Sequence, residues 1–140
     1  MTTKIITLGE IMLRLKAPGV ERFFQSPAFE ATFGGGEGNV AISLANFGLD
    51  VAFVTALPKN PLADACVRFL RGYGVDTRYI WRGGERLGVY FWRAGPTSAP
   101  PTSFTTAQIP RLLLFPPTAL IGMPFLTARA GSTSPASLRL

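Results

Sequence analysis

Strand-like and helix-like hydrophobic patterns alternate along residues 4–92. Residues 51–57 form a continuous apolar run, which is typical of a strand buried inside a parallel sheet. Residues 11–16 instead alternate between two sets of side chains, which predicts a half-exposed strand. On these patterns the predicted strands cover residues 4–9, 11–16, 28–33, 51–57, 77–81 and 87–92.

Two helices are predicted between these strands. The first covers residues 37–47 and ends at Gly48. Its predicted apolar positions are Val40, Leu44 and Phe47. The second begins at Pro61, after Asn60 as its N-cap. Its predicted apolar face consists of Leu62, Cys66, Phe69, Leu70 and Tyr73.

This alternation of strands and helices predicts an α/β fold with a mainly parallel sheet. The last two predicted strands, residues 77–81 and 87–92, flank Gly83 and Gly84. No helix is predicted between these two strands, so they depart from the simple alternation of strands and helices. We therefore expect them to form a small β flap beside the sheet.

The composition changes abruptly after Arg93. All eight acidic residues lie at or before Glu85, and eight of the twelve prolines lie after Arg93. We therefore predict two parts: a folded part, residues 1–93, and an irregular Pro-, Ser- and Thr-rich tail, residues 94–140. A frameshifted reading would explain the change at a single point, and a natural Pro- and Ser-rich tail is the alternative.

Charge and cysteine content exclude several classes of function. The formal net charge is +6, but the basic residues are scattered singly, so no nucleic-acid-binding surface is predicted. With one cysteine and no histidine, the chain offers no zinc site and no metal site is predicted. The lone Cys66 fits a reducing cytoplasm. Prolines interrupt the apolar residues 109–126, so no membrane span is expected.

The segment Gly34-Gly35-Gly36-Glu37-Gly38-Asn39 carries the candidate chemistry. A strand runs into four glycines within five residues, and a helix begins at once. A ligand can approach such a backbone without meeting Cβ atoms, and free N–H groups at the helix start can bind its oxygen atoms. The Asn39 amide both donates and accepts, which suits a sugar hydroxyl.

Three interpretations of this segment compete. A dinucleotide site needs a third glycine where Asn39 stands, and an acidic residue after the next strand, which ends Leu57-Pro58. A purely structural glycine turn is the second interpretation. A sugar site is the third.

The wider sequence favours the sugar site. Gly34-Gly35-Gly36-Glu37-Gly38-Asn39-Val40-Ala41 resembles the N-terminal signature of the ribokinase (PfkB) family of carbohydrate kinases. Thr7-Leu8-Gly9-Glu10 resembles that family's first strand and turn, and Arg86-Leu87-Gly88-Val89-Tyr90-Phe91 resembles the strand that faces the sugar. Within the family, these segments are most similar to 2-keto-3-deoxygluconate kinases.

The resemblance implies the N-terminal part of a ribokinase-like, doubly wound, mainly parallel sheet with a small β lid, and with the C-terminal half missing. It implies ATP-dependent phosphorylation of a sugar or sugar acid in the cytoplasm, with Mg²⁺, and possible homo-oligomers through the lid strands. The residues that it assigns to the substrate are Gly35, Gly36, Glu37, Gly38, Asn39 and Tyr90.

The family's catalytic aspartate lies in a downstream Asp-Thr-x-Gly-Ala-Gly-Asp motif. This chain has no aspartate after Asp76, so no catalytic residue and no ATP-binding residue is predicted in it. The alternative function is therefore a catalytically silent truncated or frameshifted fragment that retains at most weak sugar binding.

Overall fold

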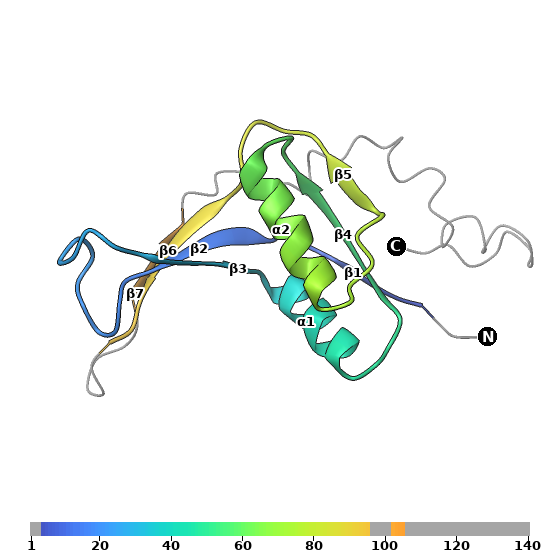
Figure 1. Ribbon diagram of the computed structural model, residues 1–140, viewed down its shortest axis with the longest axis horizontal. Helices are drawn as coiled ribbons and strands as arrows, with labels where there is room; N and C mark the ends of the chain where they lie inside the picture. The colour runs from blue at the N-terminus through green and yellow to red at the C-terminus, as the bar shows by residue number, and fades with distance from the viewer. Residues whose placement is uncertain (1–3, 96–101, 106–140) are drawn as a thin grey trace, which may run out of the picture.

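The computed structural model describes residues 4–95 and 102–105 (Figure 1). Two helices and seven strands form in these residues. In chain order they are β1 (Ile5–Leu8), β2 (Met12–Lys16), β3 (Glu30–Gly34), α1 (Gly36–Asn46), β4 (Val51–Leu57), α2 (Pro61–Gly72), β5 (Ile80–Arg82), β6 (Val89–Arg93) and β7 (Thr102–Thr105). The predicted alternation of strands and helices is confirmed.

The strands form two sheets. One is parallel throughout, in the order β1-β4-β5. The other, here called the lid sheet, has the order β3-β2-β6-β7, with β2 and β6 parallel and its outer strands antiparallel. Figure 1 shows the lid sheet extending away from the layer that contains both helices.

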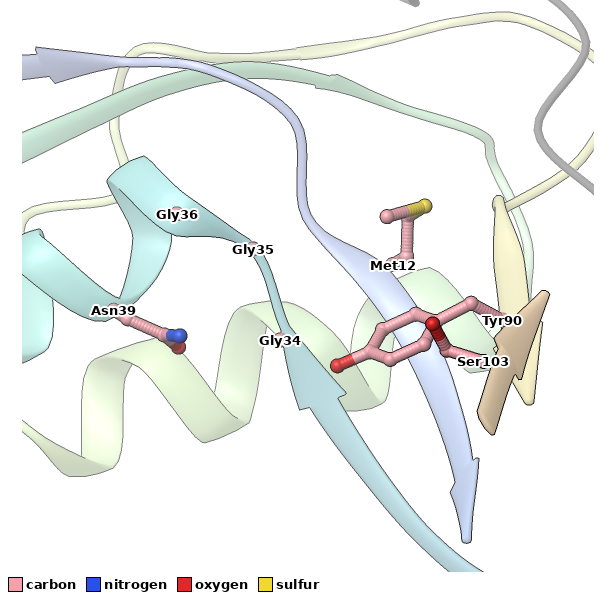
Figure 2. A pocket seen from close by; sticks show the side chains of 7 residues that line it. All are labelled: Met12, Gly34, Gly35, Gly36, Asn39, Tyr90 and Ser103. Carbon is pink, nitrogen blue, oxygen red and sulfur yellow. The ribbon is translucent and has the colours of Figure 1, made fainter. Parts of the chain in front are cut away.

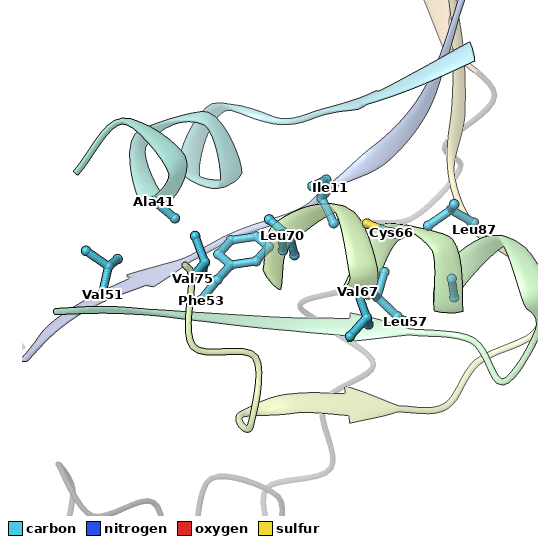
Figure 3. Close-up of a cluster of buried hydrophobic side chains, with 11 residues drawn as sticks. Ile11, Ala41, Val51, Phe53, Leu57, Cys66, Val67, Leu70, Val75 and Leu87 are labelled. Atoms are coloured by element: carbon cyan, nitrogen blue, oxygen red, sulfur yellow. The ribbon is translucent and has the colours of Figure 1, made fainter. Parts of the chain in front are cut away.

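The hydrophobic core lies between β4 and the two helices (Figure 3). Every residue of β4 is buried, as its continuous apolar run predicts. Phe53 is the largest fully buried side chain. The buried members of this cluster are Ile11, Ala41, Val51, Phe53, Leu57, Ala63, Cys66, Val67, Leu70, Val75 and Leu87.

The predicted apolar face of α1 is wrong for two of its three residues, and only Leu44 packs against the core. Val40 and Phe47 are 50% and 79% exposed, whereas Gly38 and Ala41 are buried. Gly38 lies against the side chains of Ile11 and Phe53, where a larger residue would not fit. The helix therefore approaches the sheet through its smallest residues.

In α2 the start is confirmed and the face is partly wrong. Asn60 accepts a hydrogen bond from the Ala63 backbone at 2.9 Å, as an N-cap does. Leu62 and Tyr73 are 51% and 43% exposed. The buried residues of the helix are Ala63, Cys66, Val67 and Leu70.

The predicted flap of residues 77–81 and 87–92 is confirmed for its second strand and wrong for its first. The first of the two becomes β5, Ile80–Arg82, which pairs with β4 in the parallel sheet after a turn that begins at Thr77. The second becomes β6, which pairs with β2. A lid sheet does form. In it β6 lies between β2 and β7, and β5 is not part of it.

The predicted irregular tail begins with an exception. Thr102–Thr105 forms β7, which pairs with β6 in the register Tyr90↔Thr105 and Trp92↔Ser103. The irregular structure predicted for residues 94–140 is therefore wrong for these four residues. Residues 96–101 and 106–140 lie outside the described part of the chain.

Two of the connections between the layers lie side by side. Residues 9–11 connect β1 to β2, and Gly34–Gly36 connects β3 to α1. At their crossing a Cβ on Gly35 would overlap the carbonyl oxygen of Glu10. Glycine is required there because two backbones meet. Among the described helices, neither has the length and apolar character of a membrane span.

Candidate functional site

A pocket of about 360 Å³ opens where the lid sheet meets the start of α1 (Figure 2). It draws on β2, β3, α1, β6 and β7 and on the bend between β3 and α1. Its lining residues are Met12, Gly34, Gly35, Gly36, Asn39, Tyr90 and Ser103. This volume lies within the range of small-molecule sites.

One wall of the pocket is the N-terminus of α1. Gly35 is the N-cap, and no side chain caps the helix. The first turn is closed by the Asn39 N–H, which donates to the Gly35 carbonyl at 2.8 Å. The N–H groups before Asn39 have no partner within the helix, and the helix dipole makes this end electropositive. This wall suits oxygen atoms of a polar ligand.

The opposite wall is Tyr90 from β6. A Cβ on Gly34 would lie 2.8 Å from the Tyr90 hydroxyl, so the phenol reaches across β2 to the backbone of β3. Figure 2 shows the Tyr90 hydroxyl and the Asn39 amide directed toward the same space near Gly34. Two polar side chains from distant parts of the chain thus converge beside bare backbone.

The glycines of the bend have different surroundings. At Gly36 a Cβ would meet nothing within 4 Å, so this residue presents open backbone to the pocket. Gly38 is buried in the core, as described above. The Glu37 carboxylate lies against Gly9.

Four of the six predicted substrate residues line the pocket: Gly35, Gly36, Asn39 and Tyr90. Glu37 and Gly38 are not among its lining residues.

Sequence reasoning missed Met12, Gly34 and Ser103. Met12 pairs with Gly34 across β2 and β3, so the alternation of the predicted strand at 11–16 was a usable signal for it. Ser103 had no signal, because it lies in the segment predicted to be irregular.

The lone cysteine takes no part in this site. Cys66 is fully buried on α2, and burial raises the pKa of its thiol to about 12. The thiol therefore stays protonated and packs as a small apolar group, as predicted.

The described residues do not fit a Mg²⁺ site. Within residues 4–95 and 102–105, no three acidic, histidine or cysteine side chains gather where a metal ion could bind. The 140-residue sequence also lacks the Gly-rich aspartate motif. No phosphoryl-transfer step is therefore derived from this chain.

Comparison with known proteins supports the family resemblance seen in the glycine-rich segment. Residues 2–98 match the model of the pfkB family of carbohydrate kinases. The chain belongs to this family. Its ribokinase-like fold, expected from the sequence, is confirmed by solved relatives.

Two relatives of this pfkB family member carry the names of sugar-acid kinases. A crystal structure of 2-dehydro-3-deoxygluconokinase from Thermotoga maritima is 48% identical with a TM-score of 0.75, over 78% of this chain and 33% of that one. A 2-dehydro-3-deoxygalactonokinase from Haloferax volcanii is 33% identical over 71% of this chain and 31% of its own length.

A third relative has the fold and a bound nucleotide. It is a sugar kinase from Pyrococcus horikoshii in complex with ATP, 21% identical with a TM-score of 0.68, over 76% of this chain and 35% of that one. This chain therefore spans about a third of the length of the relatives it matches.

Proposed function

We propose that this chain provides the sugar-binding part of an ATP-dependent carbohydrate kinase that phosphorylates 2-keto-3-deoxygluconate, the sugar acid also called 2-dehydro-3-deoxygluconate. The observation that carries the proposal is the pocket in which the uncapped start of α1, Asn39 and Tyr90 converge. A polyhydroxylated ligand finds donors, an acceptor and exposed backbone there.

Phosphoryl transfer needs groups that these 140 residues do not supply. A general base must accept the proton of the sugar hydroxyl, and positive groups must stabilise the transferring phosphoryl group. We therefore expect the chain to bind sugar acid without turning over ATP. This division corresponds to the alternative predicted above, a silent fragment that keeps its sugar site.

Isothermal titration of the full chain with 2-keto-3-deoxygluconate tests the sugar site. We expect binding in the wild type and a loss of about tenfold or more in Asn39→Ala, because a buried ligand hydroxyl loses its partner. Asn46→Ala is the matched control, since Asn46 is an exposed residue at the far end of the same helix. Absence of binding in the wild type, or equal loss in both variants, would exclude the proposed site.

An ATP-consumption assay tests the second part of the proposal. Measurable turnover by the 140-residue chain that disappears in Asn39→Ala would show that the chain carries a complete active site. That result would contradict the division described here.

A further inference from the structure

A cation, Arg14, lies outside the lining of the pocket, on the face of the lid sheet that carries the pocket residues Met12 and Tyr90. Arg14 is the direct partner of Tyr90 in the pairing of β2 with β6, and of Thr32 in the pairing of β2 with β3. Residues paired in this way project from the same face of a sheet. Arg14 therefore stands beside the Tyr90 ring, two residues along β2 from the pocket residue Met12.

One hydrogen bond fixes the orientation of the Arg14 guanidinium. Its Nε donates to Thr32 Oγ1 at 2.8 Å. Thr32 is neutral, so it positions the guanidinium without neutralising it. The bond uses the donor nearest the chain, and it leaves the two terminal nitrogens for another acceptor.

Lys16 shows what a cation on this face does when it has a protein partner. Its Nζ forms an ion pair with Glu30 at 2.9 Å and lies 5.8 Å from the centre of the Trp92 ring. No ion pair joins Arg14 to an acidic side chain in residues 4–95 and 102–105. A half-buried guanidinium near the pocket, on the same face of the lid sheet, is thus left to pair with an anion from outside the protein.

We propose that Arg14 is a specificity-determining residue, whose terminal guanidinium nitrogens bind the carboxylate of a sugar acid lying with its hydroxyls toward Asn39 and α1. The inference rests on the proposed function and names the part of the ligand that this pocket selects. A carboxylate matches the planar fork of arginine with two parallel hydrogen bonds, which a sugar hydroxyl cannot do.

Titration of the full chain with two ligands tests this proposal. One is 2-keto-3-deoxygluconate, and the other is 3-deoxyfructose, in which a CH₂OH group replaces the carboxylate. We expect Arg14→Met to weaken binding of the acid by about tenfold or more and to change binding of the neutral sugar by less than about twofold. Thr32→Val, which removes the acceptor for Nε, should weaken binding of the acid to an intermediate degree.

Lys16→Met is the matched control, because it removes a charge from the same face of β2. It should leave the preference for the acid unchanged. Equal weakening of both ligands by Arg14→Met would show a structural role, and unchanged binding of the acid would show no contact. Either result overturns the proposal.

The outcomes also separate this inference from the proposed function. If the wild type binds the neutral sugar as tightly as the acid, the sugar site stands and the role of Arg14 fails. If the wild type binds neither ligand, the proposed function itself fails. Far-UV circular dichroism of each variant shows whether it is folded.

Discussion

The two sheets of this protein differ in how completely they are buried. Every residue of β4 in the parallel sheet is buried, whereas every residue of β2 and β6 in the lid sheet is half-buried. Packing of apolar surface therefore concentrates in the parallel layer. The lid sheet contributes Tyr90 and Ser103 to the pocket, and α1 of the parallel layer contributes Asn39.

The candidate site lies where these layers meet. The parallel layer positions α1 through the core contacts of Gly38 and Ala41. The lid sheet brings Tyr90 against Gly34. A rigid helix end and a partly solvated sheet therefore face each other across the pocket, which is a suitable arrangement for admitting a polar ligand.

The largest expected effect is a loss of stability when a core side chain of the parallel layer is removed. Phe53→Ala removes the largest fully buried side chain, and we expect it to lower the free energy of unfolding by about 3–5 kcal/mol. Urea unfolding followed by circular dichroism measures the loss. Val20→Ala is the control, because Val20 is 62% exposed and its truncation should change stability by less than about 0.5 kcal/mol. Similar losses in the two variants would contradict a core centred on β4.

The next effect concerns the crossing between the layers. Gly35→Ala places a methyl group against the Glu10 carbonyl, so the backbone must shift, at a cost of about 1–3 kcal/mol. Gly36→Ala, one residue later, meets open space and should keep its stability within about 0.5 kcal/mol. Thermal unfolding of both variants checks this difference. Equal stability of Gly35→Ala and wild type would mean that the two connections do not touch.

A smaller expected effect depends on pH and concerns the carboxylate of Asp76. The Arg78 guanidinium, with help from Lys4, holds the pKa of Asp76 below its ordinary value of 3.8. Its contribution to stability is therefore present above that value and is lost as the pH falls below it. Because Arg78 is 72% exposed, we expect Asp76→Asn to cost only about 1 kcal/mol at neutral pH.

Urea titrations between pH 2 and pH 7 measure this contribution. The stability of Asp76→Asn should fall less steeply with acid than that of the wild type. Identical acid dependence of the two proteins would show that Asp76 is not the group responsible.

The smallest effect belongs to the lid sheet. Lys16 and Glu30 form an ion pair at 2.9 Å, and the Glu30 side chain is 53% exposed. Lys16→Met should therefore change the free energy of unfolding by less than about 1 kcal/mol. A double-mutant cycle with Glu30→Gln gives the pair energy directly. A coupling of several kcal/mol would mean that this ion pair in the lid sheet contributes as much to the free energy of unfolding as a large core side chain does.

Local signals in the sequence predicted much of the parallel layer. The continuous apolar run of β4, the N-cap at Asn60 and the glycine bend before α1 each act within a few residues. For the same reason the predicted substrate residues Gly35, Gly36 and Asn39 could be placed in or next to that bend, and they line the pocket. A homo-oligomer through the lid strands stays a prediction.

The faces of the helices were harder to predict. In α1 the small residues Gly38 and Ala41 are buried, while the larger Val40 faces solvent. Apolar residues occur on several sides of this helix, so their spacing did not define one face. The close approach of α1 to Ile11 and Phe53 determines which face of the helix is buried.

By itself the sequence determined β1, β4 and both helices of the parallel layer, the N-cap of α2 and the glycine-rich start of α1, because these depend on neighbours along the chain. Only the tertiary structure decided that β2 pairs with β6. That pairing joins residues more than seventy positions apart, and it brings Tyr90 against Gly34 and beside Arg14. Such contacts follow from register and twist across a whole sheet, which no local pattern encodes.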